Sequence, residues 1–191
     1  MTADTRTVIA ALTGATREIT SAEVSDKRGV PHEPGFYAWW VKAGALAGVP
    51  PCPHPREDRW DLLYVGIGPA RSSSTQTLRT RVLGNHLGGN IGSSTFRLSL
   101  AALLLEKLEL HPTQRGKKAH LAPPENHRIS ARQRENLRLT WAVHPQPWRI
   151  EGAVISTLGP PLNLTGNRRH PFHQTMSQAR RELRARAADP R

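Results

Sequence analysis

The chain has 191 residues, and its 27 Lys and Arg against 15 Asp and Glu give a formal net charge of +12 at pH 7. A chain of this length suits one domain that buries its core without disulfides or structural metals. Its only cysteine, Cys52, excludes an internal disulfide and a cysteine-rich zinc site. No stretch approaches the ~18 apolar residues of a membrane span, and the N-terminus lacks the pattern of a signal peptide, so we expect a cytoplasmic protein without a membrane partner.

The positive charge favours a polyanionic partner. Arginine greatly outnumbers lysine, and guanidinium groups match phosphate oxygens while their binding releases condensed counterions. Nucleic acid is therefore the first candidate partner. Charge alone leaves the alternative of a basic protein without such a partner open.

The first half of the chain predicts one helix, two strands and a second helix. A short helix is expected around residues 8–12, and the prolines and glycine of VPHEPG mark a boundary before Gly35. FYAWWV and WDLLYVGI predict strands, with a Pro- and Gly-rich loop at residues 41–58 between them. A loop at residues 68–77 then leads into a helix that contains Leu78, Val82 and Leu83.

The second half begins with the strongest helical signal, FRLSLAALLLEKLEL, which is apolar on most faces and should be substantially buried. Residues 111–128 are basic, contain prolines and predict an exposed loop. NLRLTWAV predicts a third strand, Pro147 the start of a helix that GPP ends, and HQTMSQARRELRARA an arginine-rich C-terminal helix. This order predicts an α+β fold with a small, mainly antiparallel sheet.

One carboxylate stands in an unusual place. Trp148, Glu151, Ile155 and Leu158 have helical spacing and share a face that is otherwise apolar, and no other acidic residue lies between positions 135 and 182. A carboxylate there needs a cation, a hydrogen-bond donor or a proton. In a phosphate-binding protein Mg²⁺ meets that need, since it binds one or two carboxylates together with water and substrate oxygens. A position at the edge of the apolar face, paired with Arg149 or another arginine, is the alternative.

The helix after the second strand supplies the complementary charge through Arg79, Arg81 and His86. Arg81 and Asn85 share one face of a regular helix, whereas Arg79 and His86 share another. An arginine near a bound phosphate would stabilise the charge that develops in a transition state. Solvent-facing arginines on a basic helix are the alternative.

Five short elements follow one another along the chain: GFY, YVG, an arginine in the following helix, a lone helical glutamate and PPLN. In this order they resemble the GIY-YIG nuclease family over residues 35–172. The resemblance implies a small three-stranded antiparallel sheet flanked by helices, here with extra N- and C-terminal helices. Residues 1–34 would be an N-terminal extension, 35–173 the nuclease domain and 174–191 a basic C-terminal helix and tail. The implied activity is hydrolysis of DNA phosphodiester bonds that depends on Mg²⁺ or Mn²⁺.

The resemblance also implies six site residues, with Glu151 as the metal ligand: Tyr37, Tyr64, Arg81, His86, Glu151 and Asn163. Tyr37 is the favoured general base, although the sequence does not fix which tyrosine acts. A tyrosine base would need its pKa of about 10 lowered by nearby cations. His86 follows Arg81 by five residues, whereas the family histidine follows by one helical turn. Either Gly84 distorts the helix or Arg79 is the matching arginine.

Two loops are longer than in compact family members, one between the tyrosine motifs and one from Gly66 to Leu78. Both are expected beside the catalytic face, where they would shape substrate choice. Basic residues outside the motif are candidates for contacts with nucleic-acid phosphates: Arg79, Arg115, Lys117, Lys118, Arg168, Arg169 and His170.

Two functions follow from these patterns. The first is a metal-dependent DNA endonuclease, with a restriction- or defence-like role and a repair-like role both open. The second is a non-catalytic nucleic-acid-binding protein that retains the fold, which the presence of all the motif side chains disfavours. A dimer would suit cleavage of both strands, but the sequence leaves the oligomeric state open.

Overall fold

The computed structural model describes residues 1–18 and 29–189. In chain order its helices, including the π-helix η1 and the 3₁₀-helix η2, and its strands are α1 (Ala3–Leu12), β1 (Arg17–Glu18), β2 (Gly35–Lys42), β3 (Trp60–Gly68), η1 (Thr80–Leu87), α3 (Thr95–Leu103), β4 (Thr113–Arg115), β5 (Lys118–His120), α4 (Pro123–Asn136), β6 (Leu137–Val143), η2 (Pro147–Arg149), α5 (Glu151–Leu158) and α6 (His173–Ala188).

The main sheet has the strand order β1-β6-β2-β3, and all neighbours are antiparallel. The three predicted strands are present as β2, β3 and β6, but the expected total of three was wrong because β1 pairs with the outer edge of β6. A strand of two residues is too short to show an alternating pattern, so its sequence carried no signal. The α+β class is as predicted.

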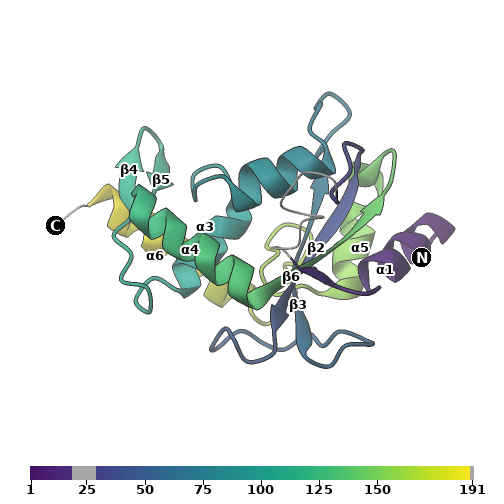
Figure 1. Cartoon of the computed structure of the whole chain (residues 1–191), viewed down its shortest axis with the longest axis horizontal. Coiled ribbons are helices and arrows are strands. Elements are labelled where there is room, and N and C mark those ends of the chain that lie inside the picture. The colour runs from purple at the N-terminus through teal and green to yellow at the C-terminus, as the bar shows by residue number, and fades with distance from the viewer. Residues whose placement is uncertain (19–28, 190–191) are drawn as a thin grey trace.

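The central strand β2 is buried on both faces of the sheet. Its odd-numbered residues from Tyr37 to Val41 pack toward η1, α3 and α6, and its even-numbered residues from Phe36 to Trp40 pack toward α1 and α5. This division follows from the alternation of side chains along a strand. Figure 1 shows the two layers, with α1 and α5 on one side of the sheet and α3, α4 and α6 on the other.

Residues 111–128 do not form the expected loop. They contain the β4–β5 hairpin, which packs on α6, and the first turns of α4. Three-residue strands are too short to be recognised by alternation. Helix α4 is largely polar, and even its narrow buried stripe of Glu125, Ile129 and Gln133 contains a single apolar residue. Both features depend on contacts with distant segments, so the local pattern missed them.

The other predicted helices are present with shifted ends. Helix α3 is well buried but ends at Leu103, and α5 begins at Glu151 because Pro147 starts a separate 3₁₀ turn. Gly159 ends α5 in the left-handed conformation, with φ of 61°. No helix within residues 1–18 and 29–189 combines the length and apolarity that crossing a membrane requires.

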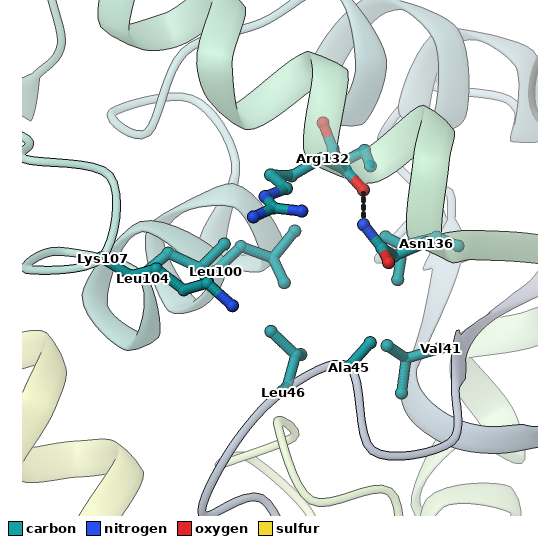
Figure 2. A pocket seen from close by; sticks show the side chains of 10 residues that line it. Val41, Ala45, Leu46, Leu100, Leu104, Lys107, Arg132 and Asn136 are labelled. Carbon is teal, nitrogen blue, oxygen red and sulfur yellow. Dashed lines mark hydrogen bonds between the residues drawn. The ribbon is translucent and has the colours of Figure 1, made fainter.

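The long loop at residues 43–59 is not beside the tyrosines, so that expectation was wrong. It joins the ends of β2 and β3 at the pair Lys42–Trp60, whereas Tyr37 pairs with Gly66 about 17 Å further along the sheet. Figure 2 shows Ala45 and Leu46 of this loop facing Leu100 and Leu104 of the opposite wall of a pocket. That pocket measures about 20 Å³, room for about one water, so the half-buried Ala45 and Leu46 pack closely against the core there.

Candidate active site

Tyr37 lies across a glycine of the neighbouring strand. Its register partner is Gly66 of β3, and a methyl group at Gly66 would overlap the phenol ring and its hydroxyl. Any larger residue would push the ring out of place. The glycine of the YVG motif therefore makes the room in which Tyr37 is held.

The Tyr37 hydroxyl forms a buried hydrogen bond of 2.6 Å with His86 Nε2. Burial, together with the nearby Tyr64, raises the pKa of Tyr37 well above 10, and the opposing effect of Arg81 is smaller. Arg81 by itself therefore does not lower the pKa of Tyr37 below its usual value, because the cost of desolvating a phenolate outweighs this one neighbouring charge. Tyr37 is a neutral phenol at pH 7.

His86 is neutral as well. Burial, assisted by the charges of Arg81 and Arg97, lowers the pKa of His86 to about 3. Its other ring nitrogen, Nδ1, lies 2.7 Å from Ser94 Oγ, and Ser94 caps the start of α3. With Nδ1–H donating to Ser94, Nε2 has a free lone pair that accepts the Tyr37 proton.

The π-helix η1 explains the five-residue spacing of Arg81 and His86. In a π-helix the hydrogen bonds join residues five apart, as the 2.9 Å bond from Gly88 N to Leu83 O does. One π turn thus places both side chains toward Tyr37, where an α-helix would rotate His86 away. The helix is distorted as a whole, and π-helical turns are frequent at functional sites.

A buried cation holds the end of η1. Arg97 is fully buried and donates to the carbonyl oxygens of His86 (3.1 Å) and Leu87 (3.3 Å), and on its other side to Asn126 Oδ1 (2.7 Å). Gln133 of α4 adds a 3.1 Å bond to the same His86 carbonyl. These bonds join η1 to α4 and fix the position of the His86 backbone.

Arg81 is the arginine that reaches this group. Its positive charge acts to lower the pKa of Tyr37, Glu151 and His86, although burial raises the pKa of Tyr37 and Glu151 overall. Gly68 permits this approach, since a Cβ there would lie 2.7 Å from Thr77 O and 3.0 Å from Arg81 Cγ. Arg79 instead forms a hydrogen bond of 2.6 Å with the exposed His32. The geometry therefore brings Arg81, and not Arg79, to the tyrosines.

Tyr64 completes the aromatic wall. Its ring centroid is 6.4 Å from that of Tyr37 and 6.2 Å from that of His86, and 9% of the residue is exposed. Two tyrosines and a histidine from β2, β3 and η1 thus meet at one end of the sheet. Tyr37 alone of the two tyrosines has a hydrogen bond to a histidine within the described residues.

Glu151 stands at the first position of α5, half-buried, where the helix dipole favours a negative charge. Burial raises the pKa of its carboxyl group, and Arg81 partly offsets the effect. In the described part of the chain its side chain has no hydrogen bond or ion pair, and no cluster of three or more His, Cys, Asp or Glu suits a metal. A lone carboxylate fits Mg²⁺, which takes its remaining ligands from water and phosphate.

Asn163 acts on the backbone of β3. Its Oδ1 accepts from Val65 N–H at 2.9 Å, and its Nδ2 donates to Val65 C=O at 2.7 Å. The amide therefore pairs with the strand as another strand would, next to Tyr64. Both hydrogen-bonding groups of the Asn163 amide are engaged with Val65, and they hold β3 in position.

The other basic residues that were predicted to contact nucleic acid do not belong to this group. Arg115, Lys117 and Lys118 belong to the exposed β4–β5 hairpin. Arg168 and Arg169 are exposed in the segment before α6, and the His170 ring accepts from Phe172 N–H within a local turn.

Sequence reasoning missed the residues that support His86. Ser94 had a readable signal, because a serine directly before a helical pattern is a common N-cap. Arg97 had one too, as the single charged residue in the apolar run FRLSLAALLL. Gln133, on a helix that was not predicted, had none.

Comparison with known families decides the assignment. The family model of the GIY-YIG catalytic domain matches residues 35–182, most of the chain. The chain belongs to the GIY-YIG family. Searches of curated proteins and of solved structures found no significant match. The GIY-YIG match starts at the first residue of β2 and extends into α6, and it identifies a domain of nuclease type.

Proposed function

We propose that the protein is a metal-dependent DNA endonuclease that hydrolyses phosphodiester bonds at the end of the sheet where Tyr37 and Tyr64 meet. One observation carries the proposal: the hydrogen-bonded Tyr37–His86 pair lies beside Arg81, which also reaches the unpaired Glu151. A tyrosine with a hydrogen-bonded proton acceptor, a cation and a free carboxylate are groups that can serve phosphodiester hydrolysis.

Glu151 would hold Mg²⁺ or Mn²⁺, which supplies Lewis-acid stabilisation of the phosphate charge and of the leaving oxygen. The carboxylate suits this role because burial raises its pKa and no protein group among the described residues satisfies its oxygens. The positive charge of the nearby Arg81 opposes this rise and favours the ionised carboxylate.

Tyr37 would accept a proton from the attacking water while it passes its own proton to His86 Nε2. The low pKa of His86 keeps that nitrogen unprotonated before substrate arrives. Binding of an anionic phosphodiester opposes the effect of Arg81 and raises the basicity of His86 when it is required. Tyr37 thus serves as base without first forming a stable phenolate.

Arg81 would donate to the phosphate oxygens, a kind of contact whose loss typically costs about 3 kcal/mol of transition-state stabilisation. Asn163 would keep β3 and Tyr64 in place through the Val65 backbone. The charge of +12 supplies the electrostatic attraction for DNA. A defence-like or repair-like role and a dimer for double-strand cleavage remain compatible with this site.

The test is plasmid nicking with Mg²⁺ or Mn²⁺ and with EDTA, using wild type, Glu151→Gln, and Glu182→Gln as a matched control from α6. We expect nicking by wild type and Glu182→Gln that EDTA abolishes, and loss of at least about 100-fold in Glu151→Gln. Binding of Mn²⁺, measured by electron paramagnetic resonance, should be lost in the same variant.

Unchanged cleavage by Glu151→Gln would disprove the proposed metal site. Tight, salt-dependent DNA binding without cleavage of plasmids that carry varied sequences and modifications would favour the non-catalytic alternative.

A further inference from the structure

A basic pocket lies outside the group of catalytic candidates. It has a volume of about 310 Å³ and lies between the start of α3, the β4–β5 hairpin and α6. Its polar wall includes Lys117 and Lys118 from the hairpin and Arg184 from α6. No acidic residue lines it. Lys117 and Lys118 are consecutive, whereas Arg184 lies more than sixty residues later in the sequence, so folding brings the third cation to the other two.

These cations lack counterions among the residues that the structure describes. None of them has an ion pair to a described carboxylate, whereas Arg186, two residues from Arg184, pairs with Glu106 at 2.7 Å and Arg132 pairs with Glu135 at 2.9 Å. The like charge of Arg184 also contributes to the lowered pKa of its neighbour Arg180. Like charges around one concavity repel one another, and an anion in the pocket would relieve the repulsion.

The pocket is adjacent to the candidate active site. Ser94 lines the pocket, and its Oγ lies 2.7 Å from His86 Nδ1, while the opposite nitrogen of that ring bonds to Tyr37. One imidazole ring and two hydrogen bonds therefore separate the pocket wall from the Tyr37 hydroxyl. This separation is short compared with one turn of DNA, about 34 Å.

We propose that Lys117, Lys118 and Arg184 form an anchor for a backbone phosphate of double-stranded DNA, distinct from the phosphate that is cleaved. The inference rests on the proposed DNA substrate and adds where the duplex is held. The anchor fixes the duplex relative to Tyr37, so it acts through binding and not through the chemical step.

The experiment compares Lys118→Gln/Arg184→Gln with the matched control Arg132→Gln/Arg186→Gln, which removes the same charge from paired positions. All four side chains lie outside the catalytic group, and thermal melting would verify that both variants fold. Binding of a fluorescent 20-base-pair duplex is measured by anisotropy in EDTA, so that no cleavage occurs, over about 50 to 200 mM salt. Plasmid nicking with Mg²⁺ supplies KM and kcat.

For Lys118→Gln/Arg184→Gln, the slope of log K against log salt should be smaller than that of wild type by about 1 for each lost phosphate contact. The control Arg132→Gln/Arg186→Gln should keep the wild-type slope. Lys118→Gln/Arg184→Gln should also raise KM with little change in kcat. Equal slopes for the two variants would overturn the anchor while leaving nuclease activity intact. Absence of DNA binding by wild type would overturn the anchor and the proposed substrate together, whereas a fall in kcat at unchanged slope would assign these residues a role other than anchoring.

Discussion

Tyr37 Oη lies 2.6 Å from His86 Nε2, and both side chains are buried. One belongs to the central strand and the other to a π-helix 49 residues later, so this contact exists only in the folded chain. Burial sets both protonation states, a neutral phenol and a neutral imidazole.

Removing either partner should stop the reaction without weakening binding. Under the proposed function, Tyr37→Phe and His86→Phe each lower kcat by about 100-fold or more, because proton transfer from water loses its acceptor. Affinity for DNA in EDTA should stay within about twofold of wild type. Because the pKa of His86 is lowered to about 3 in the free protein, the wild-type kcat/KM should show no step at pH 6.5. Activity of Tyr37→Phe within about threefold of wild type would contradict this role.

A methyl group at Gly66 should displace the Tyr37 ring. Gly66→Ala is expected to cost about 1 to 3 kcal/mol of stability, as overpacking does, and to reduce activity by more than the loss of folded protein explains. Gly152→Ala is the control, since a Cβ there meets open space beside Glu151. Urea unfolding and nicking rates measure both effects. Equal stability and equal nicking rates of Gly66→Ala and Gly152→Ala would refute the close contact between Gly66 and the Tyr37 ring.

His86 should make the fold sensitive to acid. Its pKa is about 3 in the folded chain and about 6.5 when unfolded, so the stabilisation is complete above pH 6.5 and is lost as pH falls toward 3. Between pH 7 and pH 5 this residue alone should lower the free energy of unfolding by about 2 kcal/mol. The free energy of unfolding of His86→Gln should fall less over that interval than that of wild type. His127→Gln, at an exposed position, should follow wild type.

Asn163 should tolerate replacement by a carboxyl group only when that group is protonated. Asn163→Asp retains an acceptor for Val65 N–H but places a charged oxygen against Val65 C=O, at an expected cost of about 1 to 3 kcal/mol at pH 7. The cost should shrink at pH 4.5, where a protonated carboxyl donates to that carbonyl. Asn163→Ala, which loses both bonds at every pH, supplies the reference. A pH-independent cost for both variants would argue against the paired geometry.

Local patterns predicted the elements whose side chains alternate or repeat strongly. The strands around Tyr37 and Tyr64 were of this kind, since β2 and β3 are nearly continuous apolar runs. The helix that carries Glu151 was predicted with its stop at Gly159, because glycine adopts the left-handed conformation that ends a helix. Strand β1, the β4–β5 hairpin and the polar helix α4 were missed, because long-range packing and not local periodicity stabilises them.

The candidate site, like the fold, was predictable from the sequence only in part. The sequence named the six motif side chains, but a regular helix would have separated Arg81 from His86. The π-helix brings them together, and contacts from Arg97 and Gln133 hold its end. The sequence also placed the long loop beside the catalytic face, whereas the antiparallel pairing of β2 with β3 puts residues 43–59 at the far end of the hairpin.

The sequence by itself determined the chemical groups present and their order: two tyrosines in strands, arginines and a histidine in the next helix, and one glutamate on an apolar helix face. Only the tertiary structure decided which arginine reaches the tyrosines, that Tyr37 and His86 are both neutral, and that Lys117, Lys118 and Arg184 share one pocket. The reason is physical: residue type and spacing are local properties, but burial and the field of distant charges, which set protonation and grouping, arise from segments that meet only on folding.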